Sequence, residues 1–224
     1  MSLPWPGVLE PGLLKGEVVA RNHRLADAAK AARWSEVFEL LELEWVSVNQ
    51  WRLGGSSWFT PLHQAAWHGA SESVVTGLLE RGALRALRAR AGQTPYDVAA
   101  ARGHTHLLEL LTAVRTRLTL ERAAALDTGL ASVIDGRLRL PGGIADSYGT
   151  PLDDCLRYPP AAVLPECPDH RLWFAVPGMY GGFSIGLMKD SYLYVESWIR
   201  VVVDSGQAHV ITHEGVTLVD EGFV

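Results

Sequence analysis

The chain has 224 residues, enough for one domain or for two small ones that each bury a core. Apolar residues make up 48% and charged residues 20%, a composition typical of globular proteins that excludes disordered and fibrous classes. The net charge of −5 argues against a broad nucleic-acid-binding surface. Residues 1–116 carry 12 basic and 11 acidic side chains, whereas residues 117–224 carry 8 and 14, and this asymmetry indicates two units.

The cysteine content and the N-terminal residues indicate the cellular compartment in which the protein is expected. Cys155 and Cys167 are too few for a disulfide framework and are typical of a reducing environment. No apolar run approaches the ~18 residues that a membrane span needs. Residues 1–6 lack the basic and apolar regions of a signal peptide. We therefore expect a cytoplasmic protein without a membrane partner.

A ten-residue pattern occurs twice in the first half of the chain. Thr60–Gly69 and Thr94–Gly103 both begin with Thr-Pro, and they start 34 residues apart. Proline suits the first position of a helix, where its missing N–H is no loss, and the threonine hydroxyl can cap that helix. A weaker copy lies upstream, with Leu25, Ala28 and Ala29 placed 37 residues before Leu62, Ala65 and Ala66. The spacing predicts three similar helical units.

These motifs closely resemble the ankyrin repeat over about 95 residues, from Asn22 to Thr116. The resemblance implies an α-solenoid of about three repeats, with a helix over 118–134 that closes the stack. His63 stands at the histidine position of the motif, which implies that its ring bridges backbone groups and is not catalytic. Gly69, Gly82 and Gly103 are expected to have positive φ at helix ends. The predicted domain covers residues 22–139, after an N-terminal extension over 1–21.

The second half changes from helical to alternating patterns. Residues 140–170 are rich in proline and predict an irregular connector with one helical turn near 153–156. Residues 171–224 then predict an antiparallel β-meander, with strands at 172–176, 182–187, 192–203, 207–212 and 216–219 and hairpin turns at 204–206 and 213–215. Residues 176–183 and 205–224 also resemble the C-terminal region of uncharacterised bacterial ankyrin-repeat proteins. The predicted fold class is α+β, with the ankyrin solenoid followed by this small β domain.

Ankyrin-type stacks bind other proteins through loop tips and a concave helix face, so the resemblance implies a protein-interaction module. Tryptophan and arginine are over-represented at binding hot spots. We expect Trp51, Arg52, Trp67 and His68 to be exposed, whereas Trp58 and Phe59 are equally consistent with packing of the loop. The predicted partner-binding residues are Trp51, Arg52, Trp58, Gln64, Trp67, His68, Arg85 and Arg88.

Four arginines lie within ten residues after the second predicted helix pair: Arg81, Arg85, Arg88 and Arg90. They could meet an acidic partner or a phosphate, or could form contacts within the protein. The sequence leaves both alternatives open.

Catalytic and metal-binding motifs are missing from the sequence. It holds no nucleophile elbow, HExxH or dinucleotide fingerprint, so we expect no cofactor and favour a protein that is not an enzyme. Residues 179–182 are glycine-rich but lack the spacing of a phosphate loop, and a tight hairpin is favoured there. A zinc could in principle be held by Cys167, Asp169 and His170 with Cys155, His209 or His213, but no CxxC or HxxxH spacing supports such a site, so no metal is predicted.

The leading hypothesis is a cytoplasmic module that binds another protein, with its oligomeric state open. One version is an immunity or antitoxin protein, an acidic binder of a cationic toxin site. The alternative is an enzyme or a small-molecule-binding protein with an aromatic-lined site between the repeats and the sheet. Residues that could line such a site are Trp67, Trp173, Tyr180, Trp198 and His209, although core packing also accounts for Trp173 and Trp198.

Overall fold

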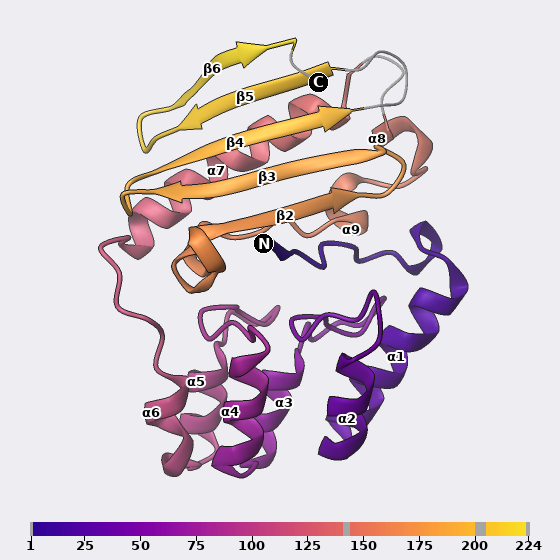
Figure 1. Ribbon diagram of the computed structural model, residues 1–224, viewed down its shortest axis with the longest axis vertical. Coiled ribbons are helices and arrows are strands. Elements are labelled where there is room, and N and C mark those ends of the chain that lie inside the picture. The colour runs from indigo at the N-terminus through magenta and orange to yellow at the C-terminus, as the bar shows by residue number, and fades with distance from the viewer. Residues whose placement is uncertain (1, 141–143, 200–204, 223–224) are drawn as a thin grey trace. The chain divides into compact units, whose positions relative to one another are not determined.

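The computed structural model describes residues 2–140, 144–199 and 205–222. Within them the fold is α+β, with paired helices in the first half and a mixed sheet of six strands (Figure 1). Contacts divide the chain into a helical unit, Glu10–Val114, and a sheet unit, Met1–Leu9 with Arg115–Val224. The division after Val114 comes earlier than the predicted one after residue 139.

The helical unit contains three consecutive pairs of helices. The first helices of the pairs are α1, α3 and α5, and contacts between α1 and α3 and between α3 and α5 place them side by side in chain order. The elements are η1 (Pro11–Leu13), α1 (Gly16–Lys30), α2 (Trp34–Leu41), α3 (Pro61–His68), α4 (Glu72–Glu80), α5 (Pro95–Ala101), η2 (Thr105–Leu107) and α6 (Leu108–Leu111). Small and branched apolar side chains such as Ala65, Ala66 and Leu62 form its buried core.

The Thr-Pro motifs start α3 and α5 as the sequence predicts. Thr94 Oγ1 accepts a hydrogen bond from Asp97 N at 3.2 Å, and the Asp97 carboxylate accepts one from Thr94 N at 2.9 Å. Thr60 and His63 form the corresponding box at α3. These reciprocal bonds satisfy N–H groups that the first turn of a helix leaves without partners. The predicted caps are therefore confirmed.

His63 is fully buried, and both of its ring nitrogens have partners. Nδ1 lies 2.9 Å from Thr60 Oγ1, and Nε2 lies 3.2 Å from the carbonyl oxygen of Gln93 in the next loop. The ring thus ties the start of α3 to the loop before α5. The predicted structural role of His63 is confirmed.

Five strands of the sheet unit form the predicted antiparallel meander in chain order. They are β2 (Arg171–Val176), β3 (Gly181–Met188), β4 (Tyr192–Ile199), β5 (Ser205–Ile211) and β6 (Val216–Glu221). The turn at 213–215 is present, where Thr212 N donates to Gly215 O at 2.9 Å. Ser205 and Gly206 do not lie in the predicted turn, because they begin β5. Asp204 of that turn and residues 200–203 of the predicted strand lie outside the described residues.

Glycines in β3 allow its neighbours to approach closely. A Cβ on Gly181 would lie 2.0 Å from the carbonyl oxygen of Trp198, and one on Gly182 would lie 2.2 Å from that of Phe174. The glycine-rich segment thus serves strand packing. It forms the turn and the strand start that the sequence favoured over a ligand loop.

The N-terminal residues belong to the sheet unit, which the sequence analysis missed. β1 (Leu3–Pro4) pairs parallel with β2 and makes the sheet mixed. Trp5 is buried; its main-chain N donates to Trp173 O and its Nε1 donates to Arg157 O, both at 2.7 Å. The predicted extension over 1–21 is therefore divided, since residues 2–9 belong to the sheet unit and α1 already begins at Gly16.

The helix predicted over 118–134 is present as α7 (Leu120–Leu138), but it lies against the sheet and belongs to the sheet unit (Figure 1). Arg137 Nη2 donates to Ser205 O at 2.9 Å, and Gly129 faces Ile211 of β5. The prediction that this helix closes the repeats was wrong. The apolar stripe of this helix predicts that one of its faces is buried, and the sheet is the surface that covers that face.

The proline-rich connector is a packed part of the sheet unit. It contains α8 (Ile144–Ser147), α9 (Leu152–Cys155), η3 (Ala161–Glu166) and η4 (Pro168–His170), and α9 lies close to the predicted helical turn. Two polar contacts attach it to α7: Ala161 N donates to Asp127 at 2.6 Å, and Tyr158 OH donates to Asp135 at 2.5 Å. Residues 141–143 of the predicted connector lie outside the described residues.

Two glycines of α7 should respond in opposite ways to alanine. A Cβ on Gly129 would lie 2.4 Å from Ile211 Cγ2, a stiff branched group, so Gly129→Ala should destabilise the sheet unit by about 1–3 kcal/mol. Gly136 lies in the same helix, is exposed and has nothing within 4 Å of its Cβ position. Gly136→Ala should stabilise by about 0.5–1 kcal/mol. Urea denaturation of both variants measures this difference, and equal effects would contradict the packing of α7 on β5.

Candidate functional site

The long loop between α2 and α3 is folded down onto the helical unit. Trp51 is fully buried and lies 6.5 Å from the ring centre of Trp58, while Leu53 is also buried. Gly54 and Trp58 have φ of 67° and 57°, in the left-handed region of the backbone. The prediction that Trp51 is exposed was therefore wrong: the loop uses it as a core residue.

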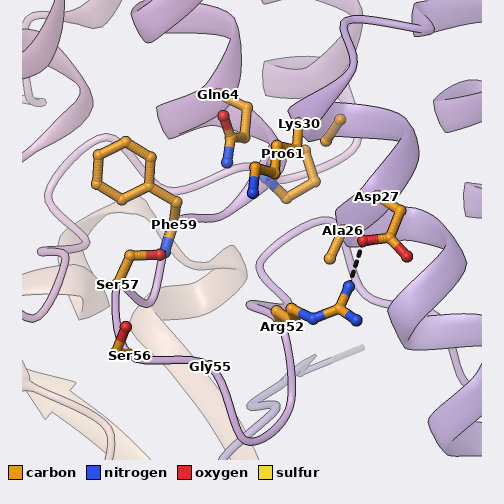
Figure 2. Close-up of a pocket in the computed structure, with 11 residues that line it drawn as sticks. Ala26, Asp27, Lys30, Arg52, Gly55, Ser56, Ser57, Phe59, Pro61 and Gln64 are labelled. Atoms are coloured by element: carbon orange, nitrogen blue, oxygen red, sulfur yellow. Dashed lines mark hydrogen bonds and ion pairs between the residues drawn. The ribbon is translucent and has the colours of Figure 1, made fainter.

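The exposed segment of this loop and two helices surround a pocket of about 480 Å³ within the helical unit (Figure 2). Its walls come from the last turns of α1, residues 52–59 of the loop and the start of α3. Phe59 lies at one end, and the Asp27–Arg52 pair lies at the other (Figure 2). The polar lining side chains are Asp27, Lys30, Arg52, Ser56, Ser57 and Gln64. Two predicted partner-binding residues, Arg52 and Gln64, are thus brought together here.

The charges at the pocket do not cancel. Arg52 Nη1 forms an ion pair with Asp27 Oδ1 across the pocket rim. Lys30 is exposed at the end of α1, and its ammonium group has no hydrogen bond or ion pair with any of the described residues. Because one of the two cations is neutralised by Asp27, the pocket keeps a net charge of about +1. Sequence reasoning missed Lys30, Ser56 and Ser57.

Trp67 and His68 lie at the end of α3 and are exposed, as predicted. The guanidinium of Arg102 lies 4.0 Å from the centre of the Trp67 ring, a cation–π contact on the surface. His68 Nε2 lies 3.0 Å from the carbonyl oxygen of Lys30, which joins the end of α3 to the end of α1. Trp67 therefore presents an aromatic surface, while part of His68 serves the packing of neighbouring helices.

The arginine group after α4 is engaged in contacts within the helical unit. Arg81 donates to Glu42 at 2.9 Å, and Arg85 Nε donates to Leu110 O at 2.8 Å. Arg88 Nη1 donates to Gly92 O at 2.6 Å, and Arg90 lies over the Trp58 ring. The sequence left open whether these arginines meet an external partner or form contacts within the protein, and the contacts observed are within the protein. Arg85 and Arg88 therefore stay predictions as partner-binding residues, and the pocket does not include them.

Of the candidate residues in the sheet unit, Trp173 and Trp198 are in contact. Trp173 and Trp198 are half-buried, with ring centres 5.6 Å apart. Tyr180 is exposed in the turn before β3. Burial and the nearby Arg137 charge lower the pKa of His209, so its ring is neutral at pH 7. These side chains place no acid and base together.

Both cysteines are buried free thiols, and burial raises the pKa of Cys167 to about 12, so that thiol is unreactive at neutral pH. Across residues 2–140, 144–199 and 205–222, no three histidine, cysteine or acidic side chains come close enough to hold a metal ion. In the same ranges no helix is long and apolar enough to cross a bilayer.

Comparison with protein-family models and with curated proteins finds no match for this chain.

Proposed function

We propose that the helical unit is an ankyrin-type solenoid and that the protein is a protein-interaction module, which binds its partner over the pocket beside α1 and α3. Three features support the solenoid: the capping boxes of α3 and α5, the side-by-side first helices, and the bonds from His63 and His68 to main-chain carbonyls of neighbouring pairs. Ankyrin-type stacks present this kind of surface to other proteins.

The observation that carries the proposal is the pocket itself. It lies where two first helices and a long loop meet, and it combines one aromatic side chain, Phe59, with several hydrogen-bonding side chains. Binding sites are usually concave and use a few well-placed polar groups to fix the orientation of what they bind. The immunity version is not part of the proposal, because it needs an acidic surface opposite a cationic toxin, whereas this pocket has a net positive charge.

A bulky side chain at the pocket tests this proposal. Ser56 is exposed on the pocket loop, so Ser56→Trp should fill the opening without disturbing the core. Thr76 is exposed on α4 and outside the pocket, and Thr76→Trp is the matched control. Affinity purification from the native lysate should recover one protein with the wild type and with Thr76→Trp, but at least tenfold less with Ser56→Trp. Equal recovery with all three, or no captured protein, would contradict the proposal.

A further inference from the structure

The pocket beside α1 and α3 has one cation in its lining that is not paired with a described acidic residue. Exposed ion pairs contribute little to stability, so the fold does not need a partner for either cation of the pocket. Arg52 is paired with Asp27. Lys30 lines the pocket, and its ammonium group makes no polar contact with the residues that the structure describes.

Neutral donors accompany this cation. Gln64 and Ser56 also line the pocket, and neither side chain is hydrogen-bonded to another described residue. In Figure 2 Lys30 and Gln64 lie on the helix side, while Ser56 lies on the loop across from them. An ammonium, an amide and a hydroxyl that face one opening are all able to donate to an anionic oxygen.

We propose, building on the proposed function, that this pocket receives an aspartate or glutamate side chain of the partner protein, with its carboxylate on Lys30 between Gln64 and Ser56. Phe59 and Pro61 form the apolar part of the lining, which suits the methylene groups and neighbouring residues of that side chain. The volume of about 480 Å³ is more than a carboxylate fills, so the pocket also holds main chain on either side of it.

A carboxylate fits the pocket better than a phosphate does. Phosphate sites in proteins usually combine a cation with bidentate arginine or with several free N–H groups at a helix N-terminus. Arg52 already gives one nitrogen to Asp27, whose negative charge lies in the same pocket. The start of α3 offers few donors, because Pro61 has no N–H and the N–H of His63 bonds to Thr60. A single free cation matches a single negative charge.

Peptide selection tests the inference. A random linear peptide library displayed on phage would be selected on the immobilised full-length protein, on Lys30→Glu and on Lys15→Glu. Lys15 is exposed before α1 and outside the pocket, so it controls for the change in net charge. The wild type and Lys15→Glu should enrich peptides with Asp or Glu at one fixed position, whereas Lys30→Glu should enrich Lys or Arg there. For a selected peptide, Lys30→Met and Glu→Gln in the peptide should each raise Kd at least tenfold.

Failures of the two proposals are distinguishable. Enriched peptides without an acidic position, or the same peptides on Lys30→Glu, would overturn the carboxylate assignment and leave the interaction module intact. If millimolar inorganic phosphate competes with the selected peptide, and this competition is lost in Lys30→Met, the pocket binds phosphate. That result would also overturn the carboxylate assignment. No enrichment on any of the three proteins would contradict the proposed function itself.

Discussion

Trp51→Ala is expected to destabilise the helical unit by about 3–5 kcal/mol, the range typical of large buried aromatic side chains. Trp51 is fully buried, and its ring centre lies 6.5 Å from that of Trp58 in the same loop. Its removal leaves a cavity that the loop can fill only in part, because Leu53 and Asn49 hold the loop on either side. Asn49 Nδ2 donates to Gly82 O, and Leu84 N donates to Asn49 Oδ1, both at 2.9 Å.

Trp67→Ala is the matched control for Trp51→Ala. The Trp67 side chain is 43% exposed and its polar neighbour is Arg102, so its loss should cost less than about 1 kcal/mol. Denaturant unfolding followed by the helical circular dichroism signal compares the two variants. A small effect of Trp51→Ala would show that the loop is not packed as described. The result also decides which tryptophan can be used in binding studies, because a Trp51 variant that unfolds cannot report on a binding surface.

The contrast between these tryptophans shows what repeat motifs can predict. Thr60, His63 and Gly69 occupy fixed positions of the repeat, and the sequence predicted their caps, bonds and positive φ correctly. Trp51 lies in an insertion between two repeats, where the period carries no information about exposure. Composition alone then suggested a binding residue. The alternation of Trp51 and Leu53 with polar neighbours was a signal for burial that the motif-based analysis did not use.

Lys30 could have been found from the sequence. It lies 37 residues before Trp67, the same offset that relates Leu25, Ala28 and Ala29 to the next copy. Trp67, which the sequence analysis singled out in the clear repeat, therefore corresponds to Lys30 in the weak upstream copy. Ser56 is different, because it faces the pocket only through the folding of an inserted loop onto α1 and α3. Such long-range placement depends on tertiary packing and has no local signature.

In the sheet unit, β2 and β4 alternate between buried and more exposed residues, and this alternation predicted them to within a few residues. All six residues of β6 are exposed. β1 was missed because it is only two residues long and includes Pro4, so it carries neither alternation nor strand propensity. For α7, helical periodicity identified the element correctly but not the surface that it covers. Gly129, which allows close approach to Ile211, was the residue that distinguished a sheet-packed helix.

The stability of the sheet unit should fall as the pH rises through the titration of Asp127. This carboxyl lies between α7 and η3, and burial raises its pKa to about 6, partly offset by the hydrogen bond from Ala161 N. The ordinary pKa of 3.8 applies in the unfolded chain. Between these values the folded state binds more protons than the unfolded state, so the free energy of unfolding decreases with increasing pH over this window.

Asp127→Asn isolates this effect, because an amide has the shape of the protonated acid and its oxygen can still accept the bond from Ala161 N. The variant should match the wild type below about pH 4 and be more stable above pH 6, by up to about 3 kcal/mol from the shift of roughly two pKa units. Urea denaturation at a series of pH values measures the difference. Asp97→Asn should show the opposite sign, since the hydrogen bond from Thr94 N lowers the pKa of Asp97 and its stabilisation is lost in acid. A pH-independent difference for Asp127→Asn would mean that water reaches this carboxylate and that the junction of α7 with η3 is open.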